Sequence, residues 1–266
     1  MTKFTMTVKN KQTIKRLYTL ALTEGEGVGT AYEYYAKRLV LLPWLASGER
    51  PKRMLIAGLP EKYGESLDFL LLGAELGCQI TVVDDRHETL ARLAYTVGKL
   101  ERASLVSYLR PALVQTNDLT ALAEVASSFD LVVSSEVLQR LEKASRAAYV
   151  DRLQELAPKG ALFAPNAENE SHVGLSGLSG VYLNELNDLI GRNPKFESRT
   201  AYIDMPPFPP GITRSDAQRA EASTGSMEAF AMWGLGIYAK MERFAPAVSR
   251  RKWAHIVYGL YEPRQR

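Results

Sequence analysis

The sequence predicts an α/β protein with a doubly wound, mostly parallel sheet. Short apolar runs that end in glycine or acid, such as Arg53-Met-Leu-Ile-Ala-Gly58 and Ile80-Thr-Val-Val-Asp84, alternate with segments of helical periodicity. The chain of 266 residues is long enough for one well-buried α/β domain with attached elements. Its 46% hydrophobic and 24% charged residues are typical of an ordinary globular protein.

The first part of the chain is expected to be helical. Residues 10–46 carry two apolar stripes at helical spacing, broken by Glu24-Gly-Glu-Gly-Val-Gly29. The second stripe is rich in tyrosine. We therefore expect an N-terminal helical extension over residues 1–50 and an α/β domain over residues 51–266.

From residue 53 onward, predicted strands and helices alternate. Such alternation favours parallel strands joined by helices on both faces of the sheet. The expected strands are 53–58, 79–84, 111–115, 129–134 and 161–164, and the expected helices are 65–76, 87–101, 119–127 and a long stretch that ends at Pro158-Lys-Gly160.

The pattern changes after residue 165, where we expect a helical lid insertion over about 166–250. A loop rich in Gly and Ser (171–180) precedes a helix (181–191) and a short strand (200–203). Pro206-Pro-Phe-Pro-Pro210 then prevents regular pairing. A helix (225–243) and a last strand (253–260) follow. The helix has a stripe that forms either an apolar lid or simple packing, made of Met227, Phe230, Met232, Trp233 and Tyr238.

Charge and cysteine content limit which partners and which cellular compartment are expected. The net charge is +3, and the only dense basic cluster, Arg250-Arg251-Lys252, is interpreted as a solvated bend, so no nucleic-acid partner is expected. One cysteine, Cys78, fits a cytoplasmic location. Because neither a signal peptide nor a membrane span is recognisable, we expect no membrane partner.

Candidate binding residues follow the first two strands, at the edge where parallel sheets bind ligands. Gly58 allows the backbone to approach a ligand closely, although glycine there also serves as a plain turn residue. Asp84 ends the second strand, where an exposed acid suits a ribose diol. Asp85 either joins it or caps the helix that starts near His87.

Two further groups follow later strands. Asn117 and Asp118 are placed either to contact an adenine amino group or, equally, to cap the next helix. Ser134, Ser135 and Glu136 end the strand that begins near Asp130, where the reacting centre of a bound cofactor would lie. Glu136 is equally explained as an acid in the first turn of a helix.

Together these motifs resemble the class I S-adenosylmethionine-dependent methyltransferases, in particular their small-molecule branch. The resemblance covers roughly residues 50–165. It is carried by Met54-Leu-Ile-Ala-Gly58, Val82-Val-Asp84, Gln115-Thr-Asn-Asp118, Phe129-Asp-Leu-Val-Val-Ser-Ser-Glu-Val-Leu138 and Leu153-Gln-Glu-Leu-Ala-Pro-Lys-Gly160.

The resemblance implies a Rossmann-like seven-stranded sheet with an antiparallel last strand, S-adenosylmethionine as cofactor and a small-molecule substrate. It implies that Gly58 lies beside the methionine moiety, Asp84 on the ribose and Asp118 near adenine, with Ser134 to Glu136 bordering the methyl donor. Family helices that precede the sheet often cover the cofactor, a role that falls to Tyr32, Tyr34 and Tyr35 here.

One motif departs from the family pattern. Instead of G-x-G-x-G, this chain has Gly58-Leu-Pro-Glu-Lys-Tyr-Gly64, in which Pro60 and Lys62 replace small residues and Gly64 restores room before the helix. A degenerate methyltransferase-like scaffold that binds a protein partner is therefore an alternative. An NAD(P)-dependent oxidoreductase is another, although the chain lacks a Gly-x-Gly-x-x-Gly turn.

Methyl transfer needs a base only where the acceptor must lose a proton. The candidates are Glu136 and His172, because both follow the carboxyl ends of strands, while a loop histidine of no chemical role is the alternative for His172. The three histidines, His87, His172 and His255, lack ligand spacing, so no metal is expected. The methyl acceptor and its accepting atom (O, N or C) stay open, as does a homodimer.

Overall fold

The computed structural model describes residues 10–62, 64–102, 110–125, 128–207 and 226–264. Its strands form one seven-stranded sheet in the order β3-β2-β1-β4-β5-β7-β6. Their bounds are β1 Arg53–Ala57, β2 Gln79–Asp84, β3 Ala112–Gln115, β4 Leu131–Ser135, β5 Gly160–Pro165, β6 Phe196–Ile203 and β7 Ile256–Pro263. The first five strands are parallel, and β7 runs antiparallel to β5 and β6. The predicted mostly parallel sheet with an antiparallel last strand is confirmed.

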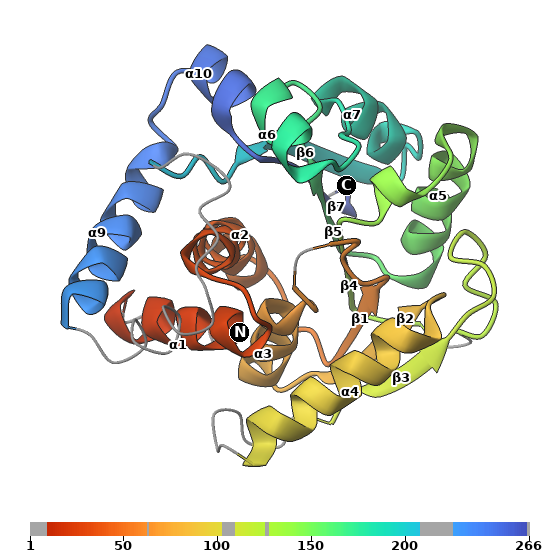
Figure 1. The fold of residues 1–266 in the computed structure, drawn as a ribbon. Coiled ribbons are helices and arrows are strands. Elements are labelled where there is room, and N and C mark those ends of the chain that lie inside the picture. The colour runs from red at the N-terminus through yellow and green to blue at the C-terminus, as the bar shows by residue number, and fades with distance from the viewer. Residues whose placement is uncertain (1–9, 63, 103–109, 126–127, 208–225, 265–266) are drawn as a thin grey trace.

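Helices cover both faces of the sheet. Figure 1 shows α1, α2 and α3 on one side and α5 and α7 on the other. The described helices are α1 Asn10–Thr23, α2 Val28–Ala46, α3 Leu67–Leu76, α4 His87–Arg102, α5 Arg146–Leu156, α6 Glu170–Ser176, α7 Leu183–Gly191, α9 Ser226–Glu242 and α10 Ala247–Trp253, with the short 3-10 helices η1 Leu138–Arg140 and η2 Lys143–Ser145.

The central strands are apolar throughout because both of their faces are covered. Successive side chains of a strand point to opposite faces. Met54 and Ile56 therefore pack with α1 to α4, whereas Leu55 and Ala57 pack with α5 and α7. Side chains of α1 and α2, such as Leu17 and Leu41, are fully buried in the first of these clusters, so the N-terminal helices are part of the core.

The parallel strands all end at one edge of the sheet, called here the carboxyl edge. Strand β7 begins at this edge, because Ile256 pairs with both Pro165 of β5 and Ile203 of β6. Loops that follow β1, β2, β4 and β5 therefore lie at the same edge as the start of β7. This is the edge where open α/β sheets bind ligands.

Three predicted elements were wrong. Residues 119–125 form hydrogen-bonded turns instead of a helix, because Leu122 adopts a left-handed conformation (φ 45°). The predicted loop 171–180 contains α6, since Asn169 caps it by accepting from the His172 N–H at 3.0 Å. Residues 250–253 lie in α10 instead of a bend and a strand, and β7 begins only at Ile256.

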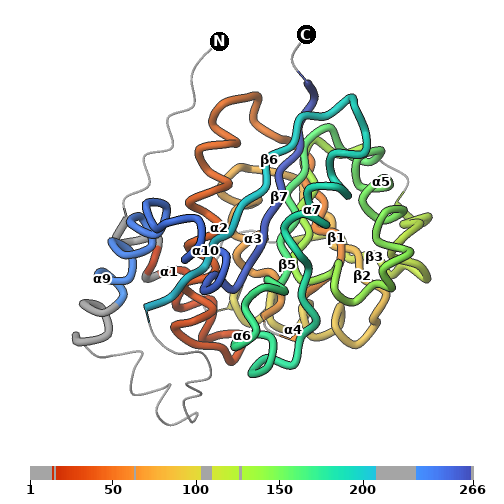
Figure 2. Tube along the Cα trace, turned by 90° about the horizontal axis from the view of Figure 1, so that it is seen from above, coloured from red at the N-terminus to blue at the C-terminus, as the bar shows by residue number. Residues whose placement is uncertain are grey.

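The predicted lid helix is α9, although residues 208–225 and the side chains of Met227 and Phe230 lie outside the described residues. Its inner face packs on α1 and α2: Met232 is buried, and the ring centroids of Tyr238 and Tyr32 are 6.2 Å apart. For these side chains the packing interpretation holds. Figure 2 shows α9 beside α1 from a second direction. None of the described helices is long and apolar enough to cross a membrane.

Candidate functional site

Gly58 ends β1 in the left-handed conformation (φ 74°), and its N–H donates to the Val83 carbonyl at 2.8 Å. A Cβ atom at this position would lie 2.5 Å from Val137 Cγ2. Glycine is therefore required twice, by the turn and by the close approach of the segment after β4. Gly64 is also left-handed (φ 75°), and Tyr34 and Glu24 of the N-terminal helices cover it.

Asp84 is fully buried, which differs from the exposed acid that we expected. Its carboxylate accepts hydrogen bonds from the Leu59 N–H at 2.6 Å, from Arg86 Nε at 2.8 Å and from Arg140 Nη1 at 3.1 Å. Burial by itself raises the pKa of Asp84, but the bonds from Arg86 and Leu59 and the charge of Arg140 outweigh it and lower this pKa. The carboxylate is thus ionised and held by its own chain.

Asp85 lies beside Asp84 and is partly exposed. Arg140 Nη2 contacts its carboxylate, so Asp85 forms an ion pair. Arg140 Nη1 also donates to the Leu59 carbonyl at 3.0 Å. The Arg140 guanidinium therefore ties the loop after β1 to the end of β2.

Asn117 and Asp118 lie at the exposed end of β3. The Asp118 carboxylate accepts from the Thr120 N–H at 2.8 Å and from the Thr120 hydroxyl at 2.7 Å, and these bonds lower its pKa. The bond pattern is that of a cap, although it stabilises a turn and no helix follows. Asn117 Nδ2 donates to Glu124 at 3.3 Å.

The residues at the end of β4 separate onto the two faces of the sheet. Ser134 Oγ lies 2.8 Å from the hydroxyl of Tyr149 in α5, which itself donates to the Ala57 carbonyl. Ser135 Oγ accepts from Lys37 Nζ of α2 at 2.9 Å. Ser135 and Lys37 are thus together on the α2 face, and Ser134 supports β1 from the other face.

Glu136 follows in a left-handed conformation (φ 55°) and is buried. Burial, together with the nearby Glu33, raises its pKa to about 8 despite the opposing effect of Lys37. Its Oε2 has no hydrogen-bond partner among the described residues. Glu136 is therefore protonated at neutral pH and has capacity for a further hydrogen bond.

Lys37 occupies the centre of a buried charged cluster that the sequence analysis missed. Its ammonium group forms an ion pair with Glu33 and lies 5.3 Å from the ring centroid of Phe69 and 5.5 Å from that of Phe163. Burial opposes the charge on Lys37, but Glu33 and Asp68 raise its pKa, so it stays charged. The Glu33 and Lys37 pair at i, i+4 in a mostly apolar helix was the available signal.

Arg38 Nε and Nη2, on α2 beside Lys37, are buried without a hydrogen-bond partner among the described residues. So are several oxygen atoms, among them Glu65 Oε2, Ser66 Oγ, Asp68 Oδ1 and Glu136 Oε2. The named oxygen atoms come from the segment that follows the glycine turn, from the start of α3 and from the end of β4. Buried polar atoms are normally paired, because an unpaired one costs about 1–3 kcal/mol. This group of unpaired atoms at the carboxyl edge indicates a place for a polar ligand.

A second group at the same edge contains two of the three histidines. The rings of His172 and His255 stack with centroids 4.2 Å apart and planes 11° apart. His255 Nδ1 lies 3.2 Å from Asp204 Oδ2, directly after β6. Their spacing in the sequence had hidden this contact. His87 lies apart and contacts Gln115.

The pKa values of the two stacked histidines are shifted in opposite directions. Burial and the neighbouring His255 lower the pKa of His172 to about 4, so this ring is neutral at pH 7. For His255, burial opposes the charge, but Asp204 raises its pKa. His172 Nδ1 is buried and has no hydrogen-bond partner among the described residues, so it has capacity for a hydrogen bond to a ligand.

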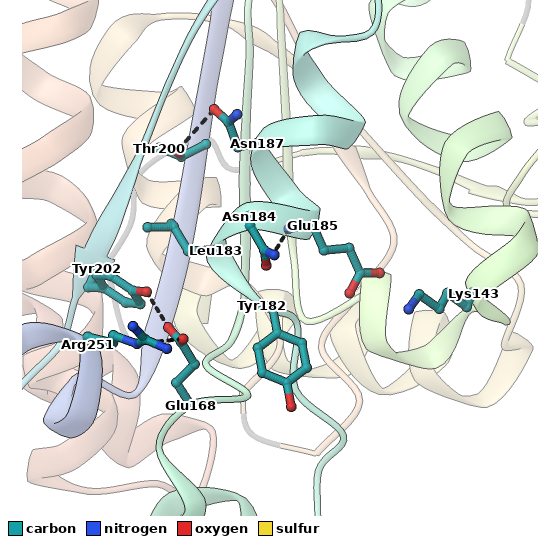
Figure 3. Close-up of a pocket in the computed structure, with 10 residues that line it drawn as sticks. All are labelled: Lys143, Glu168, Tyr182, Leu183, Asn184, Glu185, Asn187, Thr200, Tyr202 and Arg251. Carbon is teal, nitrogen blue, oxygen red and sulfur yellow. Dashed lines mark hydrogen bonds and ion pairs between the residues drawn. The ribbon is translucent and has the colours of Figure 1, made fainter.

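A hollow of about 700 Å³ lies on the α7 side of β6, and Figure 3 shows the side chains that line it. Glu168 accepts from the Tyr202 hydroxyl and pairs with Arg251 Nε at 2.7 Å. Glu185 pairs with Arg146 at 2.7 Å. Both acids are therefore neutralised by their neighbours, and none of the predicted site residues lines this hollow. Among the residues described, no group of His, Cys, Asp and Glu has the arrangement of a metal site.

No protein-family model and no curated protein matches the sequence, but solved structures match the fold. The methyltransferase domain of bacterial CtHen1 has a TM-score of 0.54 at 16% identity, covering 87% of this chain and 98% of that one. Magnesium protoporphyrin IX methyltransferase from Synechocystis PCC 6803 with bound S-adenosylhomocysteine has a TM-score of 0.53 at 14% identity, covering 96% of this chain and 100% of that one. An S-adenosylmethionine-dependent methyltransferase from Clostridium acetobutylicum ATCC 824 has a TM-score of 0.50 at 7% identity, covering 88% of this chain and 92% of that one. The chain has the class I methyltransferase fold, as its motifs predicted.

Proposed function

We propose that this chain is an enzyme that transfers a methyl group from S-adenosylmethionine to an oxygen, nitrogen or carbon atom of a small molecule. The observation that carries the proposal is the group of unpaired buried atoms around Lys37 at the carboxyl edge of this fold. A bound cofactor supplies an electrophilic methyl group on sulfur. The remaining tasks, which are positioning, exclusion of water and proton transfer, belong to the protein.

The residues at the methionine end fit an amino-acid-like group. Asp68 and Glu136 offer oxygen atoms to an ammonium group, while Ser66 offers a hydroxyl and Lys37 a positive charge to a carboxylate. These side chains are buried, so water is excluded from most of this region. Gly58 and Gly64 lie in the loop between β1 and α3, next to these side chains.

The position of Asp84 suits the ribose of the cofactor, but the Asp84 carboxylate already accepts hydrogen bonds from its own chain. Arg86 and Arg140 hold the Asp84 oxygens to which a diol would donate. We propose that the ribose replaces the bond from Arg140, which is the more distant of the two residues along the chain. Asp85, Asn117 and Asp118 border the same end, and Ser134 and Ser135 support the strand that faces it.

We propose His172 as the residue that accepts a proton from the methyl acceptor. Its neutral ring has a buried Nδ1 without a partner, and Asp204 keeps the stacked His255 in place. Glu136 is the second candidate, and it would act as a base only above about pH 8, where its carboxyl group ionises. A cytoplasmic location and a homodimer stay predictions.

One observation favours a second function. Arg86 and Arg140 occupy the Asp84 oxygens that a ribose would need. The chain is therefore alternatively a methyltransferase-like scaffold that binds a protein partner. Calorimetric titration of S-adenosylmethionine, S-adenosylhomocysteine and NADH into the purified chain separates these functions. We expect micromolar binding of the two sulfur compounds that Ser66→Ala weakens at least about tenfold, the effect of losing one hydrogen bond to a charged group. No binding of either compound would favour the scaffold, and binding of NADH alone would favour an oxidoreductase.

A further inference from the structure

Helices α9 and α10 present an outer surface that the proposed methyl transfer does not use. Met232, Gly236 and Ala239 point from α9 toward α1 and α2. Ile237 and Met241, one helical turn apart, lie on the opposite side of α9 and are exposed. In Figure 1 these two helices form the outer rim of the molecule beside α1 and α6.

This surface continues beyond the end of α9. Phe244 in the turn is 73% exposed, Val248 at the start of α10 is 78% exposed, and Trp253 at its end is 52% exposed. Met241 is 60% exposed, so the short segment 241–253 places several large apolar side chains in water. Several exposed apolar side chains in one short segment favour an interaction site. We call the exposed side chains of residues 237–253 the α9–α10 surface.

The charge of the α9–α10 surface is of one sign. Its basic residues are Lys240, Arg243, Arg250, Arg251 and Lys252. The single acid in this range, Glu242, is buried and is held by the Tyr32 hydroxyl at 2.8 Å and the Met205 N–H at 3.1 Å. Arg251 is partly neutralised by Glu168. The surface therefore carries an excess of positive charge among its apolar side chains.

Two cations lie directly on aromatic rings of this surface. The Arg243 guanidinium is 4.7 Å from the Phe244 ring centroid, and Lys252 Nζ is 5.1 Å from that of Trp253. Each pair combines a ring, which prefers the boundary between water and hydrocarbon, with a cation that binds phosphate. Basic residues next to exposed aromatic and aliphatic side chains are the composition of helices that lie in a membrane interface.

We propose that the α9–α10 surface docks on an anionic phospholipid bilayer. The apolar side chains enter the boundary between headgroups and acyl chains, and the basic residues contact lipid phosphates. Charge complementarity selects this occupant, because a second copy of the same surface would bring like charges together. The expectation of no membrane partner rested on the absence of a spanning segment, which peripheral docking does not need.

Docking would place the carboxyl edge near the lipid. Glu242, on the inner side of α9, joins this helix through Tyr32 to α2 and through Met205 to the end of β6. The helix that carries the docking surface is thus tied to α2 and to the end of β6, next to elements that carry candidate site residues. The proposal itself does not depend on methyl transfer, because lipid binding is measured without cofactor.

Cosedimentation with vesicles tests the proposal. We expect the full chain to bind vesicles of phosphatidylcholine mixed with phosphatidylglycerol and to bind pure phosphatidylcholine at least about tenfold more weakly. Met241→Ser with Phe244→Ser should weaken binding at least about tenfold through lost apolar burial. Lys240→Gln with Arg243→Gln should also weaken vesicle binding, by about fivefold for each positive charge removed.

The matched control is Tyr95→Ser with Lys99→Gln, an exposed aromatic and basic pair on α4 that is remote from α9. It should bind vesicles like the unchanged chain. Circular dichroism checks that every variant is folded, since all the altered side chains are exposed or partly so. Equal binding by all variants, or no binding to anionic vesicles, overturns the proposal. Self-association in sedimentation velocity that the Met241 and Phe244 changes abolish, without vesicle binding, would assign the surface to a second copy instead.

Discussion

At the scale of single residues, Asp84 decides how the candidate site is to be tested. Its carboxylate is buried and bonded to Leu59, Arg86 and Arg140. Replacing it with alanine would remove the buried anion that Arg86 and Arg140 share, and breaking a buried ion pair costs about 3–5 kcal/mol. Lost binding in that variant would therefore also reflect lost folding. A change at Arg140 is more informative.

Arg140→Gln should tighten the binding of S-adenosylhomocysteine. If a ribose diol takes the place of Arg140 at Asp84, the variant no longer has to give up a charged hydrogen bond, which is worth about 1.5–3 kcal/mol, or roughly 10- to 100-fold in Kd. Calorimetry measures the effect. Arg192→Gln is the control, because this arginine pairs with Asp151 at 3.9 Å and lies just before the start of β6, at the opposite edge of the sheet. Unchanged or weaker binding in the Arg140 variant would show that the ribose and Arg140 do not compete.

His172 makes stability depend on pH in a defined direction. Its pKa is lowered from 6.5 to about 4 in the folded chain, so between these values only the unfolded chain binds the proton. Stability from His172 is complete above pH 6.5 and is lost as pH falls toward 4, by at most about 3 kcal/mol. Urea unfolding at about pH 7 and about pH 4.5 should show this loss in the unchanged chain and a smaller loss in His172→Phe. Equal losses would contradict the assigned ionisation.

At the scale of elements, the pairing of β5 with β7 depends on one close contact. Gly160 begins β5 opposite Tyr261, and a Cβ atom at this glycine would fall inside the buried Tyr261 ring. The ring belongs to the second core cluster and lies 5.2 Å, centroid to centroid, from Phe196. It therefore has little room to move aside.

Gly160→Ala should lower the free energy of unfolding by about 1–3 kcal/mol through overpacking. Denaturant unfolding monitored by circular dichroism measures it. Gly174→Ala in α6 is the matched control, because nothing lies within 4 Å of its added Cβ. There alanine should be neutral or stabilising by up to about 1 kcal/mol. A Gly160 variant as stable as this control would mean that Tyr261 is not fixed above β5.

The local sequence of each helix or strand explains whether that element was predictable. Strands β1, β2 and β4 were predicted within two residues, because buried parallel strands are continuous apolar runs. Helix α6 was missed, since its Gly and Ser residues indicate a loop and only the Asn169 cap favours a helix. Helix α10 was missed because its basic residues have no inward apolar partner. The helix expected at 119–127 was wrong because propensity does not reveal a left-handed Leu122.

At the scale of the whole molecule, the candidate site combines segments far apart in the sequence. The strand-end residues Gly58, Asp84 and Glu136 were predictable, because a parallel topology brings strand ends together. Lys37 reaches Ser135 from a helix 98 residues earlier, and His172 stacks on His255, so tertiary packing alone creates these contacts. The bonds around Asp84 were equally unpredictable, since nothing in the sequence indicated that Arg140 would bond to its carboxylate.

We propose that the carboxyl edge of this fold holds S-adenosylmethionine beside Lys37. A crystal structure of the chain with S-adenosylhomocysteine tests it most directly. The aminocarboxylate group should contact Ser66, Asp68 or Glu136, and the ribose should bond to Asp84 with the Arg140 guanidinium displaced. A structure in which the ligand lies away from Lys37, or in which saturating ligand leaves this edge empty and Arg140 in place on Asp84, would contradict the claim.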